Sequence, residues 1–423
     1  MHVAIITAGG AGMFCGSCMH DNTWARALQE NGCEVSLIPT YTPIRVDEDN
    51  ISTHRVFFGG INVYLEHRSK LWQSLPRFMT SWLDAPWLIN LATRFSVSND
   101  AKQLGALTVD MLEGELGPQK KEVEQLAQYL AQLKPDAVCF SNALLVGVVH
   151  RLRETYSGKI ICTLQGDDIF LESLTDNYRE QSIQLISKRA QEFDGFLVHS
   201  HYYRDFMANY LSLPAEKFRK IPLGIDLDGH TGKPTKRKND AFTIGYFARI
   251  CPEKGLHNLI AAFRLVRQKY PSSKLKAGGY LGSRDHEYAE QTFSAAADLG
   301  DAFEFIGSPE THDEKVAFLS SLDVLSVPTD YLEPKGISIL ESIANGTPVV
   351  QPNHGAFPEL IDATAGGILH EAGNNQALAE SLIRMQEDTQ FRLDLAAAGH
   401  KRVREAFSPK SLADATVEAI ESL

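Results

Sequence analysis

Short apolar runs alternate with helix-length segments along almost the whole chain. In the first half, the runs that we predict to be strands are Val3–Thr7, Glu34–Ile38, Ala137–Phe140, Ile160–Leu164 and Gly195–Val198. In the second half they are Phe242–Phe247, Lys274–Ala277, Phe303–Ile306, Val324–Val327 and Pro348–Gln351. Strands that alternate with helices are typical of parallel sheets with right-handed crossovers. The pattern therefore predicts an α/β fold with two Rossmann-like, doubly wound parallel-sheet domains.

A polar segment interrupts this alternation once. Residues 228–240, DGHTGKPTKRKND, are basic and contain glycine and proline, as is typical of a linker. We therefore predict a first domain over residues 1–226 and a second over residues 227–407. Because ligands of open parallel sheets bind beyond the carboxyl ends of the strands, we expect both domains to face one cleft.

Residues from about 60 to 121 do not follow the simple alternation. Trp72, Trp82 and Trp87 stand in this stretch among leucines and phenylalanines at helical spacing. We predict a helical insertion in the first domain that packs on its own side chains. A lid over an acceptor and a contact with a membrane surface are the open alternatives, since Arg68 and other cations stand nearby.

The composition excludes several classes of protein. The 423 residues are 43% hydrophobic and 22% charged, which is ordinary for globular domains. A net charge of −12 argues against a nucleic-acid-binding protein, because such domains are normally basic. The start, from Met1 to Ile6, has no basic leader, and no apolar run is long enough to span a membrane. We expect a cytoplasmic protein with reduced cysteines.

One stretch of the second half places two carboxylates around a predicted helix start. It is EPKGISILE, from Glu333 to Glu341, with seven residues between the two glutamates. A helix that begins near Gly336 offers free backbone N–H groups to a phosphate, and glycine allows a close approach. Glu341 can accept hydrogen bonds from ribose hydroxyls, and Glu333 from a sugar beside the phosphate. Two solvated glutamates beside an ordinary helix cap are the alternative.

A second stretch supplies two cations. Arg249 and Lys254 stand five residues apart in the loop after the first predicted strand of the second domain. An arginine fork and a lysine point charge can hold a diphosphate and stabilise a leaving phosphate without a metal ion. The alternative is a surface loop with two solvated cations.

Together, these stretches resemble the retaining GT-B glycosyltransferases of glycosyltransferase family four, also called glycosyl transferases group 1. The family has an Arg…Lys-Gly loop followed by E-P-x-G-x-x-x-x-E, and this chain has both in that order. Phe303–Gly307 and Gly346–Val350 resemble further strands and turns of the family. The resemblance implies the GT-B fold, with two Rossmann-like domains that face a cleft. It also implies a final helix, at 408–423, that crosses back to the first domain.

Residue roles follow from the resemblance position by position. Arg249 and Lys254 would bind the donor diphosphate, Glu333 the transferred sugar and Glu341 the ribose. The further positions implied for donor binding are Gly10, Gly12, Gln165, Gly278, Lys335, Gly336, Ile337 and Ser338. The implied donor is a nucleoside-diphosphate sugar, bound without a metal ion or a cofactor.

The first domain departs from the family at one position. Many members carry a histidine in a turn after a strand of this domain, where this chain has Gln165. Glutamine can hydrogen-bond a sugar hydroxyl but cannot take up a proton. In a front-face mechanism the leaving phosphate accepts the proton, so the histidine is not required. Asp167 or Asp168 is the candidate for acid–base work or acceptor binding, with helix capping as the alternative role of these aspartates.

Cysteines and histidines of the first domain add weaker candidates. Cys15 and Cys18 form a C-x-x-C at a predicted helix start, where a thiol is acidified, but no second pair is spaced for zinc. We expect packed, reduced thiols. Ser200 is predicted to cap a helix, and a role of the adjacent His199 or His201 in the cleft is left open.

The predicted function is metal-independent transfer of a hexose, with retention, from a nucleoside-diphosphate sugar to an acceptor hydroxyl. The acceptor is expected to be a carbohydrate or a lipid-linked molecule, which leaves peripheral contact with the inner face of a membrane open. Two alternatives are a catalytically silent nucleotide-sugar binder, favoured by Gln165, and a nucleotide-sugar epimerase. The paired glutamates argue against the epimerase.

Overall fold

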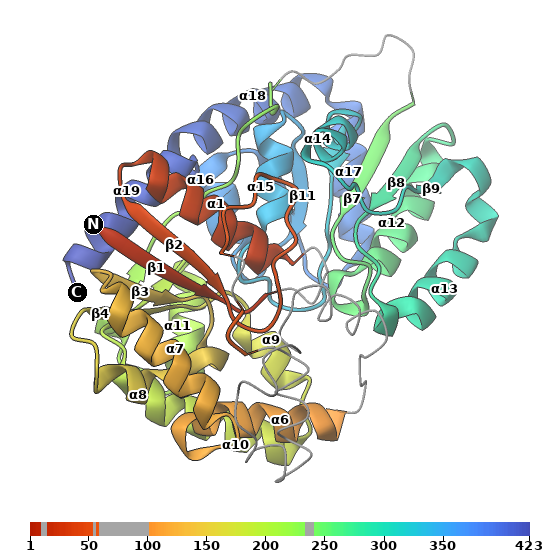
Figure 1. The fold of residues 1–423 in the computed structure, drawn as a ribbon. Helices are drawn as coiled ribbons and strands as arrows, with labels where there is room; N and C mark the ends of the chain where they lie inside the picture. Colours follow the sequence, from red (N-terminus) through yellow and green to blue (C-terminus); the bar gives the residue numbers. More distant parts are fainter. Residues whose placement is uncertain (10–14, 54–55, 59–100, 233–240) are drawn as a thin grey trace. The chain divides into compact units, whose positions relative to one another are not determined.

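The chain folds into two compact units (Figure 1). Unit 1 comprises Met1–Ile221 and Leu412–Leu423, and unit 2 comprises Pro222–Ser411. The computed structural model describes residues 1–9, 15–53, 56–58, 101–232 and 241–423. Most of the predicted linker and most of the predicted insertion at 60–121 lie outside the described residues. The described part of that insertion, from residue 101, is largely helical.

Unit 1 contains a six-stranded parallel sheet in the order β2-β1-β3-β4-β5-β6. Its strands are β1 (His2–Thr7), β2 (Glu34–Pro39), β3 (Ala137–Phe140), β4 (Lys159–Thr163), β5 (Gly195–Val198) and β6 (Phe218–Lys220). The helices in its described residues are α1 (Gly16–Glu30), α6 (Ala101–Glu113), α7 (Lys120–Leu133), α8 (Val149–Arg153), α9 (Asp167–Glu172), α10 (Asp176–Arg189), α11 (His201–Tyr210) and α19 (Pro409–Glu421).

The strands of unit 1 are apolar on both faces, which explains the continuous apolar runs in the sequence. Ala4 and Ile6 of β1 belong to one buried cluster with residues of α7 and α10. Val3 and Ile5 belong to another, with residues of α1 and α19. Successive side chains of a strand point to opposite faces, so the sheet is covered by helices on both sides.

The last helix, α19, packs in unit 1 although the chain reaches it from unit 2. Leu412 and Ile420 are buried in the same cluster as β1. Thr416 accepts a buried hydrogen bond from Trp24 Nε1 at 2.9 Å. Figure 1 shows α19, at the blue end of the chain, beside the N-terminal strands. These contacts tie the two ends of the chain into one core.

Unit 2 contains a second six-stranded parallel sheet, in the order β12-β11-β10-β7-β8-β9. Its strands are β7 (Thr243–Phe247), β8 (Lys274–Gly278), β9 (Phe303–Phe305), β10 (Val324–Leu325), β11 (Val349–Pro352) and β12 (Gly367–His370). Its helices are α12 (Leu256–Lys269), α13 (His286–Ala295), α14 (His312–Ser320), α15 (Ile337–Ala344), α16 (Phe357–Thr364), α17 (Asn375–Glu387) and α18 (Thr389–Ala406).

The predicted α/β class with two parallel, doubly wound sheets is confirmed. Each predicted strand coincides with a strand of the structure to within a few residues. The prediction missed β6 and β12, which lie at the outer edges of the two sheets. The three residues of β6 are Phe, Arg and Lys, because an edge strand is partly solvated and needs no continuous apolar run.

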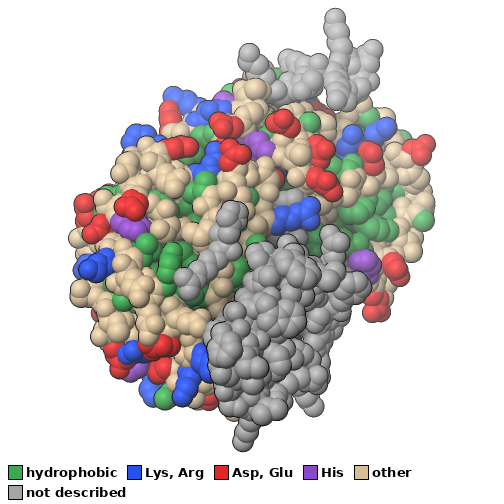
Figure 2. All heavy atoms as spheres, viewed as in Figure 1, with side chains coloured by type: hydrophobic (Ala, Val, Ile, Leu, Met, Phe, Trp, Pro, Cys, Tyr) green, Lys and Arg blue, Asp and Glu red, His purple; other side chains and the backbone are tan. Residues whose placement is uncertain are grey.

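Acidic and basic side chains are interspersed on the face shown in Figure 2, rather than gathered into a basic stripe. No helix in the described ranges is long and apolar enough to cross a bilayer.

Candidate active site

Two loops of unit 2 meet where its strand order reverses. The chain runs from β7 through β8 to β9, and β10 then pairs with the other side of β7. The loop after β7 carries Arg249 and Lys254, and the loop after β10 carries Glu333. A backbone hydrogen bond from Asp330 N–H to the Glu253 carbonyl, 3.0 Å long, joins these loops. Such a reversal is where open parallel sheets bind ligands.

Gly255 permits the close approach of the two loops. Its φ is +70°, and a Cβ atom at this position would lie 1.9 Å from the carbonyl oxygen of Pro328. Any other residue would push the loops apart and strain the backbone. This close approach explains why a glycine follows Lys254 in the sequence motif.

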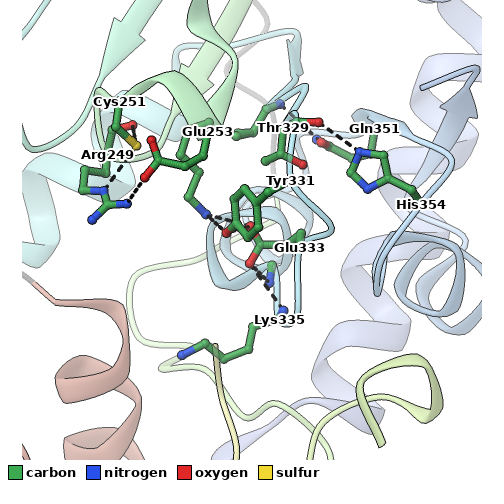
Figure 3. Close-up of polar contacts among 12 residues, drawn as sticks. Arg249, Cys251, Glu253, Thr329, Tyr331, Glu333, Lys335, Gln351 and His354 are labelled. Carbon is green, nitrogen blue, oxygen red and sulfur yellow. Dashed lines mark hydrogen bonds and ion pairs between the residues drawn. The ribbon is translucent and has the colours of Figure 1, made fainter. Parts of the chain in front are cut away.

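Lys254, Tyr331 and Glu333 form a closed hydrogen-bonded group, of which Figure 3 labels Tyr331 and Glu333. Lys254 Nζ lies 2.7 Å from Glu333 Oε2 and 2.6 Å from the Tyr331 hydroxyl, which donates to the same Oε2 at 2.6 Å. Burial alone would raise the pKa of Glu333. Lys254, Tyr331 and the Lys335 backbone N–H outweigh it and hold the pKa below its ordinary value. The group therefore keeps an ionised carboxylate beside an ammonium.

Tyr331 is absent from the residues predicted from the sequence. Burial, and then the charge of Glu333, raise the pKa of Tyr331 well above its ordinary value, so the hydroxyl keeps its proton and remains a donor. The sequence feature that could have pointed to Tyr331 is its position two residues before Glu333. That signal is weak, because a loop tyrosine is equally common on a surface.

Arg249 is paired within its own loop. Its guanidinium donates to Glu253 Oε1 at 2.9 Å, and its Nε lies 3.3 Å from Cys251 Sγ (Figure 3). Arg284 approaches the same carboxylate at 3.8 Å. Each of the two cations predicted to bind a diphosphate thus has a carboxylate partner in the structure, Glu253 for Arg249 and Glu333 for Lys254.

The helix start predicted near Gly336 is confirmed. Gly336 has φ +88° and precedes α15, which begins at Ile337. The backbone N–H groups of Lys335 and Gly336 donate to Glu333 Oε1, each at 3.3 Å. The N–H groups of the first turn, including those of Ile337 and Ser338, have no acceptor inside a helix. They form the positive end of α15 beside the Lys254 group.

Glu341 is paired with a lysine that the sequence did not mark. Its Oε1 lies 2.7 Å from Nζ of Lys315 on α14, and the two side chains are 8% and 3% exposed, respectively. Glu341 Oε2 makes no hydrogen bond with the residues that the structure describes. Lys315 therefore engages one oxygen of this buried carboxylate.

Gly278 lies where the chain after β8 passes the chain after β7. Its carbonyl accepts a hydrogen bond from Ala248 N–H at 3.2 Å. Gly279 has φ +140°, and a Cβ atom there would lie 1.8 Å from the Ala248 carbonyl oxygen. The Gly-Gly turn thus shapes the start of the loop that carries Arg249.

Gln165 lies in unit 1, in the turn after β4. It is buried, and its Nε2 donates to Asp21 Oδ1 at 3.1 Å and to the Ser141 carbonyl at 2.8 Å. The glutamine therefore ties together α1 and the ends of β3 and β4. The predicted glycines of the neighbouring loop, Gly10 and Gly12, lie outside the described residues.

Asp167 is bound by backbone groups of unit 1. Its Oδ1 accepts from Ala143 N–H at 2.5 Å, and its Oδ2 accepts from Gln165 N–H at 3.0 Å. Burial raises the pKa of Asp167 to about 6. The N-cap residue of α9 is Gly166, and no side chain accepts a hydrogen bond at that cap. Asp167 therefore does not cap the helix. Its geometry is that of a group that fixes two loops.

The other candidates of unit 1 have local roles. Ser200 caps α11 by accepting from Tyr203 N–H at 3.1 Å, as predicted. No disulfide is formed among the described cysteines, and a hydrogen bond with Cys15 is the largest cause that raises the pKa of Cys18. His199 packs edge-on against His20, with ring centroids 4.6 Å apart.

The described residues contain no group of three or more His, Cys, Asp or Glu side chains arranged to hold a metal ion.

The sequence also matches a known family. Residues 231–402 match the family described as glycosyl transferases group 1. This range contains both loops of the candidate site and both glutamates of the motif. The family that the motifs predicted is therefore the one that this part of the chain matches.

Individual proteins with similar sequences are named as glycosyltransferases. "Putative colanic acid biosynthesis glycosyltransferase WcaL" of Escherichia coli strain K12 is 26% identical over 282 residues, which cover 66% of this chain and 65% of the relative. The match therefore spans just under two thirds of that protein. A "GDP-mannose-dependent monoacylated alpha-(1-6)-phosphatidylinositol monomannoside mannosyltransferase" of Corynebacterium glutamicum is 25% identical over 323 residues, 72% of this chain and 81% of the relative.

The fold has counterparts among solved structures. The Anabaena protein Alr3699/HepE, crystallised in complex with UDP and glucose, has a TM-score of 0.68 and 17% identity. The similarity covers 100% of both chains. The predicted GT-B fold is confirmed.

Proposed function

We propose that this protein is a retaining glycosyltransferase that moves a hexose from a nucleoside-diphosphate sugar to an acceptor hydroxyl without a metal ion. The observation that carries the proposal is the contact of Lys254 with Glu333 beside the start of α15. A lysine, an ionised carboxylate and a helix N-terminus lie together at the strand-order reversal of unit 2. This set of groups fits a phosphorylated sugar.

The donor class is supported by the names of similar proteins. The Corynebacterium relative is named as GDP-mannose-dependent, and the Anabaena structure holds UDP and glucose. In our proposal the diphosphate takes the place of Glu253 at Arg249 and of Glu333 at Lys254. Released from Lys254, Glu333 can accept hydrogen bonds from hydroxyls of the transferred sugar.

The chemical step needs few groups. The acceptor oxygen forms a bond to the anomeric carbon on the face from which the diphosphate departs, and the bond from that carbon to the β-phosphate oxygen breaks. The acceptor proton passes to the departing phosphate oxygen. Arg249 and Lys254 stabilise the charge that develops on that phosphate.

The names of the relatives also suggest the acceptor class and the location of the protein. One relative is named for colanic acid biosynthesis and the other for a phosphatidylinositol mannoside, so a carbohydrate or lipid-linked acceptor fits both. We propose a cytoplasmic protein that reaches such acceptors at the membrane surface.

A direct test combines binding and turnover. Purified protein is titrated with UDP-, GDP- and ADP-sugars by calorimetry, nucleotide release is followed, and the anomeric configuration of the first product is read by NMR. Lys254→Ala is expected to lower turnover by about 100-fold to 1,000-fold, because it removes one stabiliser of the leaving group. Lys269→Ala, which changes an exposed lysine of unit 2 that pairs with Glu387, is the control and should keep the wild-type rate.

Unchanged turnover in Lys254→Ala with an intact circular dichroism spectrum contradicts the proposed site. A product of inverted configuration contradicts the retaining mechanism.

A catalytically silent nucleotide-sugar binder is the second candidate. The observation in its favour is that Gln165 and Asp167 are both engaged in the internal structure of unit 1. A binder would show donor affinity with neither transfer nor hydrolysis. Release of nucleotide from any of the three donors excludes it.

A further inference from the structure

A buried ion pair joins α14 to α15 at one of the proposed donor-binding residues. Lys315 and Glu341 lie 2.7 Å apart, with side chains 3% and 8% exposed. Burying two charges costs several kcal/mol, and a buried pair seldom adds net stability over apolar residues of the same size. The effect of this pair is therefore best sought in what Lys315 does to Glu341.

We propose that Lys315 is the positioning residue for the nucleoside end of the donor, an inference that rests on the proposed function. By holding Oε1, Lys315 fixes the orientation of the Glu341 carboxylate and leaves Oε2 for the ribose hydroxyls. Lys315 is not part of the sequence motifs that point to the site.

The helix geometry supports this arrangement. Glu341 lies four residues after Ile337 and so on the same face of α15, about 6 Å further along the axis. A ligand whose phosphate lies at the first turn of α15 therefore presents the adjoining ribose near Glu341. Without Lys315 that carboxylate would sample several rotamers and would lose binding free energy when ordered by the ligand.

The charge of Lys315 matters as well as its position. A nucleoside diphosphate is an anion. Without the positive charge of Lys315, the buried Glu341 carboxylate would repel this anion, because little water screens the two charges. Lys315 neutralises the carboxylate without removing its acceptor oxygen. An apolar residue at position 315 cannot do this.

A second link between the same helices provides a matched control. Asn345, the C-cap of α15, donates from Nδ2 to the Val316 carbonyl at 3.0 Å and to Ser320 Oγ at 2.9 Å. It joins α15 to α14 as Lys315 does. If Lys315 only holds the two helices together, loss of Asn345 should have the same consequences.

The experiment measures ribose recognition rather than overall affinity. Calorimetry gives the Kd values of UDP and GDP and of their 2′-deoxy and 3′-deoxy forms for the wild type, Lys315→Met, Glu341→Gln and Asn345→Ala. We expect the wild type to prefer a ribonucleotide by about tenfold or more, as is usual for a hydrogen bond to a charged group. Lys315→Met should lower this ratio towards one, as Glu341→Gln does, and Asn345→Ala should keep it.

Two further variants protect the test against a failure to fold. Lys315→Arg keeps the charge and should retain most of the preference, whereas Lys315→Gln keeps only hydrogen bonding and should lose most of it. Circular dichroism identifies any variant that has lost its structure.

Each remaining outcome overturns the inference. A wild-type preference that survives in Lys315→Met and Lys315→Gln excludes a positioning role, and an equal loss in Asn345→Ala assigns the pair to helix packing. Binding by the wild type without any ribose preference defeats this inference alone. If the wild type binds neither of these diphosphates nor ADP, the proposed function itself fails and the inference falls with it.

Discussion

Glu333 is a buried carboxylate whose ionised form is held by its neighbours. Burial acts to raise its pKa, but Lys254 and Tyr331 bring the net pKa below the ordinary value of 4.5. A group with a lowered pKa in the folded state contributes stability that is fully present above its unfolded pKa. That stability is lost as the pH falls through the folded pKa. The Lys254–Glu333 contact should therefore stabilise unit 2 at neutral pH and cease to do so in acid.

The variant Glu333→Gln tests this at the scale of one residue. At pH 7 we expect it to be about 1–3 kcal/mol less stable than the wild type, because Lys254 loses a charged partner. The difference should shrink as the pH falls below 4.5. Urea unfolding followed by far-ultraviolet circular dichroism, from pH 7 to about pH 3.5, measures it. Glu290→Gln, at an exposed position of α13, should run parallel to the wild type throughout. A constant gap for Glu333→Gln at every pH would contradict the assignment of charge.

At the scale of elements, α19 is joined to α1 by a buried side-chain hydrogen bond. Trp24 Nε1 of α1 donates to Thr416 Oγ1 of α19, and both side chains are buried. Thr416→Val keeps the volume but leaves the indole N–H without an acceptor. We expect a loss of about 1–3 kcal/mol. All four tryptophans, at 24, 72, 82 and 87, precede residue 222, so urea unfolding followed by tryptophan fluorescence measures it.

Thr416→Ser separates the hydrogen bond from the packing of α19. It keeps the hydroxyl and removes one methyl group, so it should lose about 1 kcal/mol or less. Equal losses in Thr416→Ser and Thr416→Val would show that the hydrogen bond contributes little.

The same elements show what the sequence could predict. Strands buried on both faces, such as β1 and β3, have continuous apolar runs, so their alternation with helices predicted both sheets. The edge strands β6 and β12 lacked that signal. The sequence motifs predicted the helix start at Gly336, because a glycine with positive φ before an apolar helix is a local feature.

The partners of the site residues were beyond such local patterns. Lys315 and Glu341 are 26 residues apart and meet only because α14 packs beside α15. The sequence motifs pointed to Lys254 and Glu333. They did not show that these two side chains form a hydrogen bond, or that Tyr331 contacts both of them. Spacing along a chain predicts periodic burial and local turns, whereas contacts between loops depend on the order of strands in the finished sheet.

At the scale of the whole molecule, the division into two units predicts two distinguishable unfolding transitions. Tryptophan fluorescence follows the part of the chain before residue 222, and circular dichroism follows both units. Arg249, Lys254, Glu333 and Glu341 all belong to unit 2, so a donor should stabilise unit 2 in preference to unit 1.

Thermal unfolding with and without a nucleoside diphosphate measures this preference. Ligand at about 100 times its Kd adds about 2.7 kcal/mol to the unit that binds it, which corresponds to a rise in Tm of roughly 5–10 °C. We expect this rise in a transition seen by circular dichroism and a much smaller one in tryptophan fluorescence. Lys254→Ala should abolish it, whereas Lys269→Ala should not. An equal rise with both probes would contradict a donor site whose main contacts lie in unit 2, because a ligand raises the stability only of what it binds in the folded state.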